Sequence, residues 1–199
     1  MSKKLALTLL CFITYFAFGF QNPKSSKWVI SKNCSLKVAG STNINKFNCD
    51  ITNYYKPDTL NIYQSSGNHP VKISGKMELE ISQFDCHNPV MTADLRKTLK
   101  AKTYPTLTIN FVSLDRYPNF KNANGELKGK VNIALAGVNK AFDVNYRYNK
   151  TAADAIALVG TQRVNFSDFK IIPPRKLGGM IETNDELDIQ FVLQLKIIN

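Results

Sequence analysis

The chain is poor in the residues on which most enzymes and metal sites depend. Its 199 residues include only two histidines, His69 and His87. His87 directly follows Cys86, whereas structural zinc sites space their ligands by about two to four residues. The sequence also contains no nucleophile elbow, phosphate-binding loop or paired-carboxylate pattern. We therefore expect no metal site, no catalytic residue and no cofactor.

An enzyme acting on a lipid or another small apolar substrate is the alternative hypothesis. It would have to use Asp168, His87 or Tyr104, grouped at one end of the fold. Asp168 follows a long strand pattern, where capping a turn is the more common role of an aspartate.

A hydrophobic run long enough to span a membrane is also missing. The apolar stretch from Leu5 to Phe18 is shorter than the ~20 residues that cross a bilayer. It follows Lys3 and Lys4 and ends in small residues near Gly19, which is the three-part pattern of a secretory signal. We predict that residues 1–19 are a signal peptide, cleaved after Gly19, and that the protein is periplasmic or secreted.

No linker rich in Ser, Gly or Pro divides the rest, so residues 20–199 are expected to form a single domain. Acidic residues are in the minority. Without Lys3 and Lys4, 24 basic residues (26 minus 2) face 15 acidic ones, a net charge of about +9. The basic residues alternate with apolar ones, which favours a solvated face. Export argues against nucleic acid as a partner, and an anionic membrane surface is the second interpretation of the charge.

Alternation of apolar and polar residues with period two dominates this domain. The last segment shows it best, with Leu187, Phe191 and Leu195 on one face and Asp188 and Gln190 on the other. Further strands are predicted at residues 28–38, 45–54, 60–64, 71–82, 106–114, 127–135, 138–148 and 156–166. This pattern indicates an all-β fold, an antiparallel β-barrel of about eight strands. A two-sheet sandwich is the alternative.

One short helix is predicted in this chain, and it begins at Asn88. The Asn88 side chain is suited to accept hydrogen bonds from the free amides of the first turn, and Pro89 suits the first helical position. Met91, Leu95 and Leu99 then recur every four residues and form one apolar stripe. Such a helix needs an apolar surface to cover, and the open end of the barrel is the natural candidate.

Three cysteines remain after the predicted cleavage: Cys34, Cys49 and Cys86. Cysteine pairs of exported proteins are usually oxidised. Cys49 and Cys86 end two similar segments, Phe-Asn-Cys and Phe-Asp-Cys, and we predict a disulfide bond between them. In the chain-entropy model this bond would stabilise the fold by ~3–4 kcal/mol. Cys34 should be free and buried.

Aromatic side chains accumulate on or beside the apolar strand faces, at Phe111, Phe142, Tyr146, Phe166, Phe169 and Phe191. An ordinary filled core would explain each of them. A barrel of about eight strands is, however, just wide enough either to fill with side chains or to hold one ligand. The sequence therefore leaves open a hollow barrel and a structural module with a filled core.

Several segments, in this order and spacing, resemble the YceI family of exported lipid-binding proteins over residues 28–198. They are VAGSTNINKF, MTADLRKTLKAKTYPTLTINF, GELKGKVNIALAGVNKAFDV, RVNFSDFKIIPP and the alternating last strand. The resemblance implies a lipocalin-like barrel whose apolar tunnel binds a polyisoprenoid chain such as a quinone. The cysteine pair and residues 88–91 depart from the family pattern.

On this resemblance the protein is expected to be a non-catalytic carrier, and its bound partner an isoprenoid lipid or quinone. Monomer and homodimer both remain open. The residues expected to line the tunnel are Met91, Leu95, Leu99, Phe111, Leu135, Phe142, Tyr146, Phe166 and Phe191.

Overall fold

The structure, a computed structural model, describes residues 24–54, 56–64 and 69–198. The predicted signal peptide, residues 1–19, lies outside these residues. The main strands are β1 (Lys24–Ile30), β2 (Cys34–Ser41), β3 (Lys46–Tyr54), β4 (Thr59–Gln64), β5 (Val71–Glu80), β6 (Thr106–Leu114), β7 (Asn124–Leu135), β8 (Val138–Ala152), β9 (Ala155–Asn165) and β12 (Glu186–Ile198). The shorter elements are η1 (Ile81–Gln83), α2 (Pro89–Thr98), η2 (Phe166–Phe169), β10 (Arg175–Lys176), η3 (Leu177–Gly179) and β11 (Ile181–Glu182). Within the described ranges, no helix has the length and apolar character needed to cross a membrane.

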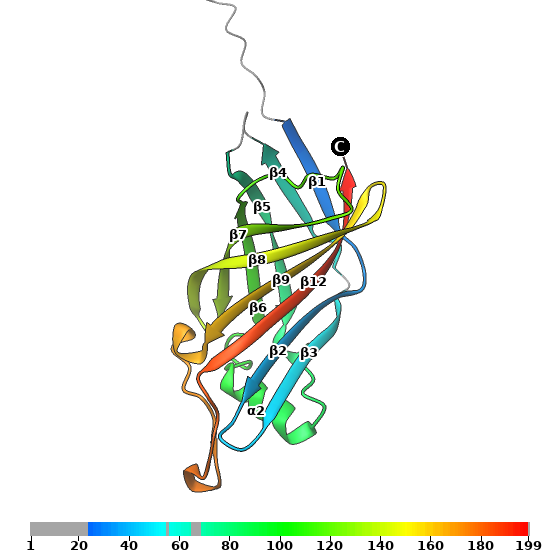
Figure 1. Ribbon diagram of the computed structural model, residues 1–199. Helices are drawn as coiled ribbons and strands as arrows, with labels where there is room; N and C mark the ends of the chain where they lie inside the picture. Colours follow the sequence, from blue (N-terminus) through cyan, green and yellow to red (C-terminus); the bar gives the residue numbers. More distant parts are fainter. Residues whose placement is uncertain (1–23, 55, 65–68, 199) are drawn as a thin grey trace, which may run out of the picture.

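Ten strands form one antiparallel sheet in the order β1-β4-β5-β6-β7-β8-β9-β12-β2-β3. The sheet closes because β1 also pairs with β12. The closed ring contains eight strands, β1, β4 to β9 and β12, which confirms the predicted barrel (Figure 1). β12 pairs with β9 along one edge, and with β2 and then β1 along the other. One long strand therefore joins the two ends of the sheet.

The prediction of a single strand at residues 28–38 is wrong. The chain bends after Ile30 and resumes at Cys34, with Asn33 in the left-handed region at φ 68°. Asparagine tolerates this conformation better than most residues do. As a result β1 and β2 follow the same edge of β12 one after the other, each at a different end of the barrel.

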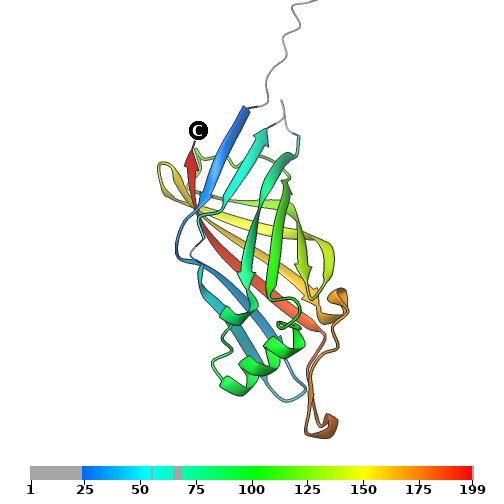
Figure 2. The ribbon, with the colours of Figure 1, turned by 180° about the vertical axis from the view of Figure 1, so that it is seen from behind.

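This bend leaves an opening in the barrel wall at one end. In the described residues, β4 pairs with β5 only through residues 61–63 and 72–74. Beyond Gly75, β5 continues to pair with β6 but no longer with β4. α2 and the segment before it lie at this opening (Figures 1 and 2). A bridge between Asp50 of β3 and Asp85 fixes that segment to the sheet. We call this end of the barrel the helix end.

Alternating side chains of the strands fill the interior. Along β12, Leu187, Phe191 and Leu195 are buried whereas Asp188 and Gln190 are exposed, which confirms the predicted faces. Each strand thus places a row of apolar side chains in the barrel, and the burial of this apolar surface is the main source of stability.

Aromatic rings close the end opposite the helix, which we call the closed end. The loop between β6 and β7 brings Tyr117 and Phe120 against the fully buried Trp28, with ring centroids 6.0 and 6.1 Å away. Phe120 also contacts Tyr148 of β8 at 6.1 Å. The Tyr148 hydroxyl donates a hydrogen bond of 3.1 Å to the carbonyl of Asn119 and so fixes the loop.

Candidate functional site

An apolar cavity of about 70 Å³ lies at the helix end, enclosed by α2, η2 and the inner face of the sheet. Sixteen residues line it, and the polar one among them is Asn165 at the end of β9. The lining residues are Leu36, Val38, Phe84, Leu95, Leu99, Leu107, Ile109, Ile133, Leu135, Val164, Asn165, Phe166, Phe169, Ile171, Leu187 and Ile189. Walls of this kind suit a hydrocarbon ligand better than a polar substrate.

A layer of aromatic rings in the middle of the barrel ends the cavity. The next inward side chains of β6 and β12 beyond the cavity wall are Phe111 and Phe191, whose ring centroids lie 6.4 Å apart. The Phe191 ring also contacts Tyr146, at 5.8 Å. It occupies the space over Gly160, where an added Cβ would lie 2.1 Å from the ring. The cavity therefore belongs to the helix end and stops at this layer.

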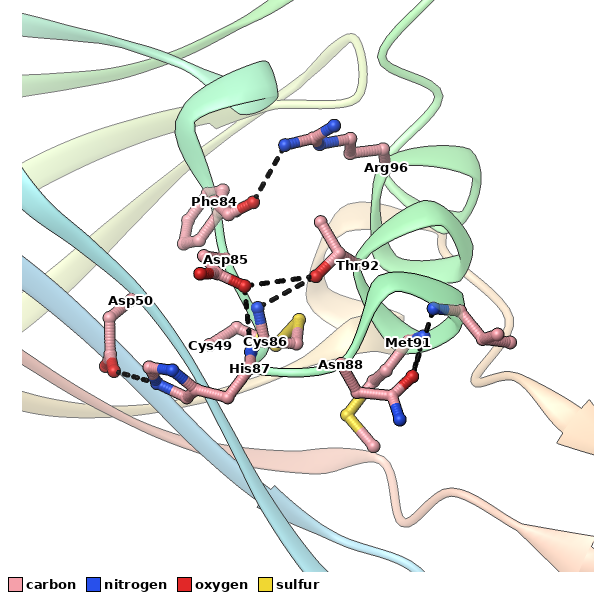
Figure 3. The surroundings of a disulfide bond; sticks show 11 residues. Cys49, Asp50, Phe84, Asp85, Cys86, His87, Asn88, Met91, Thr92 and Arg96 are labelled. Atoms are coloured by element: carbon pink, nitrogen blue, oxygen red, sulfur yellow. Dashed lines mark hydrogen bonds and ion pairs between the residues drawn. A yellow bond between two sulfur atoms is a disulfide. The ribbon is translucent and has the colours of Figure 1, made fainter.

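α2 forms part of the cavity wall because its sequence fixes where the helix begins. Asn88 Oδ1 accepts hydrogen bonds of 3.0 Å from the backbone N–H groups of Val90 and Met91 (Figure 3). This contact confirms the predicted N-cap, and the proline that follows needs no intrahelical partner. From this start, Leu95 and Leu99 reach the cavity.

A disulfide bond between Cys49 of β3 and Cys86 ties the segment before α2 to the sheet (Figure 3). The bond confirms the predicted pair, and Cys34 is the free, buried cysteine. Burial raises the pKa of the Cys34 thiol, which keeps the thiol protonated and unreactive. Beside the disulfide, His87 Nε2 lies 2.9 Å from Asp50 Oδ2.

Polar contacts join α2 to the segment that precedes it. The Thr92 hydroxyl, which is almost fully buried, accepts a hydrogen bond of 3.0 Å from the Cys86 N–H. Arg96 donates to the carbonyl group of Phe84 at 3.1 Å (Figure 3) and to that of Ser82. α2 and residues 82–88 therefore form one covering unit, anchored to β3 by the disulfide.

η2 brings Phe166 and Phe169 to the opposite wall of the cavity. Its capping box joins Asn165, whose side chain accepts from the Asp168 N–H, to Asp168, whose Oδ2 accepts from the Asn165 N–H at 2.9 Å. Lys140 Nζ donates to Asp168 Oδ1 at 2.5 Å. Desolvation works to raise the pKa of Asp168, but the hydrogen bonds from Lys140 and Asn165 hold it below its usual range.

Comparison with known proteins places this geometry in a family. Residues 22–195 match the model of the YceI-like domain. The chain belongs to the YceI-like family. No curated protein matches it.

Two solved structures show the same barrel. BcnA of Burkholderia cenocepacia has a TM-score of 0.60 at 13% identity, over 83% of this chain and 96% of that chain. A polyisoprenoid binding domain from Saccharophagus degradans, implicated in plant cell wall breakdown, has a TM-score of 0.59 at 11% identity, over 85% of this chain and 97% of that chain. At such low identities these similarities show a shared fold.

Four of the nine residues predicted to line a tunnel lie on the cavity of this YceI-like barrel. They are Leu95, Leu99, Leu135 and Phe166. Phe111, Tyr146 and Phe191 form the aromatic layer at its inner limit.

The remaining two predicted residues lie outside the cavity wall. The Phe142 ring packs against Phe169, with centroids 5.8 Å apart, behind the lining. Met91 is 38% exposed and faces an outer groove, because it lies in the first turn of α2, close to the exposed N-cap. The stripe predicted for the helix is therefore divided between an inner and an outer surface.

Several residues that line the cavity were not predicted from the sequence. Phe84 precedes the helix, and Ile171 follows η2, so neither shows a periodic pattern. Leu36, Ile133 and Val164, in contrast, are inward residues of strands near the helix end. Their alternation in the sequence, combined with the predicted place of the helix, was a usable signal for them.

The three residues of the enzyme hypothesis have separate surroundings. Asp168 caps η2, His87 contacts Asp50, and Tyr104 is 41% exposed with its ring against Gly137. In the part of the chain that the structure describes, no group of three His, Cys, Asp or Glu side chains could hold a metal ion. This arrangement gives the enzyme hypothesis no support.

Proposed function

We propose that the protein is a non-catalytic carrier that binds the hydrocarbon chain of an isoprenoid lipid in the cavity at the helix end. The observation that carries the proposal is the lining of this cavity, in which fifteen of sixteen residues are apolar. The name of the structurally similar polyisoprenoid binding domain supports the same ligand class. Each Å² of hydrocarbon removed from water contributes about 25 cal/mol, so a prenyl chain needs few polar contacts to bind.

The size of the cavity sets a condition on this proposal. Pockets for small ligands usually measure about 300–1,000 Å³, whereas this cavity measures about 70 Å³. A long chain would therefore have to displace side chains. The strands are held by ladders of hydrogen bonds, while the covering unit of α2 is joined to the sheet by one disulfide, one bridge and the contact of His87 with Asp50. We infer that the cavity enlarges by movement of this covering unit.

A quinone ring at the mouth is the more specific form of the proposal. A quinone carries two carbonyl oxygens, which accept hydrogen bonds. Asn165 is the polar lining residue, and its amide oxygen is already used in the capping box, so its NH₂ group remains as a donor. Lys140, which contacts Asp168, supplies a second donor nearby.

Location in the periplasm or outside the cell completes the proposal. The disulfide between Cys49 and Cys86 is typical of an oxidising compartment. The proposed signal peptide, residues 1–19, would direct the chain there, and residues 20–199 would be the functional domain.

Analysis of the bound lipid tests the proposed function. The protein, produced with its own leader and purified from the periplasmic fraction, is extracted with organic solvent and the extract is analysed by mass spectrometry. We expect a prenyl lipid, and saturable binding of added ubiquinone. The absence of both would refute the proposal.

A matched pair of variants in α2 locates the binding site. Leu95→Trp places a large side chain in the cavity and should reduce the amount of bound lipid. Ala93→Trp adds the same side chain at an exposed position of the same helix and should leave the amount unchanged. Equal lipid content in both variants would place the ligand elsewhere.

A further inference from the structure

Large apolar side chains are exposed mainly at one end of the barrel. Nine such residues are exposed in the described part of the chain, and seven of them belong to segments at the helix end. These seven are Ile44, Val90, Met91, Tyr104, Ile172, Leu177 and Met180. The other two, Tyr63 and Ile198, lie at the closed end. Single exposed apolar residues are ordinary, but a gathering from four separate segments indicates an interaction surface.

The most exposed part of this surface is an arm formed by residues 172–183. Figure 1 shows the arm in orange, extending past the barrel wall at the helix end, and Figure 2 shows the same from behind. Leu177 and Met180 at its tip are 65% and 70% exposed. Between them, Gly178 and Gly179 hold positive φ angles, and an added Cβ at either would contact nothing within 4 Å. The tip therefore presents two apolar side chains directly to the surroundings.

Contacts with the rest of the helix end fix the position of the arm. The backbone N–H of Asn43 donates to the carbonyl of Glu182 at 3.0 Å, and its side-chain amide donates to the carbonyl of Met180 at 2.9 Å. Lys176 Nζ lies 2.5 Å from Asp94 of α2. The arm, the turn between β2 and β3, and α2 therefore present their apolar residues as one surface.

This surface adjoins the cavity. A groove runs between the arm, the turn and α2, and its lining includes Ile44, Val90 and Met91. Leu95 and Phe166 line both this groove and the inner cavity. The two side chains are thus the partition between the cavity and the exposed apolar surface.

Unpaired positive charge accompanies the apolar residues. Five exposed lysines at the helix end make no ion pair with any described residue: Lys46, Lys97, Lys100, Lys102 and Lys170. Of the carboxylates at the same end, Asp94, Asp168 and Glu182 are ion-paired, whereas Asp85 and Asp185 accept hydrogen bonds from His87 and Ser167. Aliphatic side chains among free lysines match an anionic bilayer surface. The core of a protein interface, in contrast, is usually depleted of lysine.

We propose that the helix end docks on an anionic lipid bilayer, with the tip of the arm inserted among the headgroups. The identity of the carried ligand, a prenyl lipid, rests on the proposed function, but the docking of this surface on a bilayer does not. Docking in this orientation brings the groove, and the partition formed by Leu95 and Phe166, against the membrane. A prenyl chain then passes between bilayer and cavity without crossing water.

Flotation with lipid vesicles tests the docking surface. The protein from the periplasmic fraction is mixed with vesicles of phosphatidylcholine alone, or of equal parts phosphatidylcholine and phosphatidylglycerol. We expect flotation with the anionic vesicles. The variant Leu177→Asn/Met180→Gln should lower the fraction bound by about tenfold, because the apolar tip is lost. Asparagine suits the φ of 50° at Leu177, so the fold should be kept.

Two controls separate the surface from general effects. The variant Tyr63→Thr/Ile198→Thr removes the exposed apolar residues of the closed end and should float like the wild type. Lys97→Gln/Lys102→Gln should weaken flotation more than Lys72→Gln/Lys128→Gln, which removes the same charge from strands β5 and β7. Equal flotation of the wild type and the arm variant, or equal effects of the two lysine pairs, would overturn the proposal.

Two further measurements identify other outcomes. If a second copy of the chain covers this surface, light scattering will show that the wild type is a dimer and the arm variant a monomer, and neither protein will float. This result would overturn membrane docking. Mass spectrometry of the same preparations reports the cargo. Flotation of a protein that neither contains a prenyl lipid nor binds added ubiquinone refutes the proposed function alone, whereas a bound prenyl lipid without flotation refutes docking alone.

Discussion

The two ends of this barrel are covered in different ways. At the closed end, Tyr117 of a loop packs edge-on and Phe120 at a tilt against Trp28, and a hydrogen bond from Tyr148 holds the loop in place. At the helix end, a separate unit of secondary structure covers the sheet, and a covalent bond anchors it.

The difference in packing coincides with the place of the cavity. Interlocking aromatic rings fill the closed end, because edge-to-face pairs leave little space between them. Leu95 of α2 and the C-cap residue Leu99 line the cavity together with Phe166 and Phe169 without filling it. One sheet can thus combine a fixed plug at one end with an adjustable cover at the other, and the cover is the part suited to admit a ligand.

The strongest disturbance should come from the aromatic layer that both ends share. Phe191→Asp would place a charge without a partner in the barrel interior, which should cost about 3–5 kcal/mol or prevent folding. Val192→Asp, at the neighbouring outward position, serves as the control and should be tolerated. Chemical denaturation of both variants measures the difference. A stable Phe191→Asp protein would show that water reaches the layer and that the barrel is open through its middle.

Removal of the disulfide should affect the helix end selectively. The variant Cys49→Ser/Cys86→Ser should lose about 3–4 kcal/mol of unfolding free energy, because the denatured chain regains the freedom of a closed loop. Hydrogen exchange should accelerate in α2 while the amides around Trp28 change less. Thiol counting on the denatured wild-type protein, processed after residue 19, should find one free thiol, Cys34. Three free thiols, or equal acceleration at both ends, would contradict this picture.

Much of this architecture could be predicted because it follows from local rules. The alternation along β12, the N-cap at Asn88 and the pairing of Cys49 with Cys86 each depend on a short pattern of residues. The bend at Asn33 was missed because the apolar residues after the polar run Ser31-Lys32-Asn33 resume in the same phase as those before it, so residues 28–38 resemble one strand. The extent of the cavity could not be predicted from the sequence, because it depends on how Phe111 and Phe191 meet across the barrel from distant strands.

Truncation of a leucine at each end gives a direct comparison. Leu114→Ala, in the filled interior, should cost about 2–5 kcal/mol because it leaves a new cavity. Leu95→Ala borders existing space, so it should cost less than about 2 kcal/mol and alter lipid binding instead. Denaturation and lipid titration of both variants decide between these outcomes. A large loss of stability with unaltered lipid binding in Leu95→Ala would make α2 a structural plug.

The smallest effect should be a pH dependence of the stability that Asp168 contributes through η2. This element carries two residues of the cavity wall. The folded state holds the pKa of Asp168 below its usual range, so the Asp168 carboxylate stabilises the fold above the ordinary aspartate value of about 4. That contribution is lost as the pH falls through the lower, folded value. Lys140 is partly exposed, and such ion pairs contribute about 1 kcal/mol or less.

The pH dependence of Asp168→Asn isolates this contribution. The melting temperature of the wild type should exceed that of the variant at neutral pH, and the difference should shrink below about pH 4. Asp143→Asn removes a highly exposed partner of Lys130 and is the matched control, with little effect expected at any pH. If Asp168 acts through η2, lipid affinity will fall over the same acidic range in the wild type and less in Asp168→Asn. A parallel fall in both proteins would assign the acid sensitivity to other groups and leave the capping box without influence on the cavity.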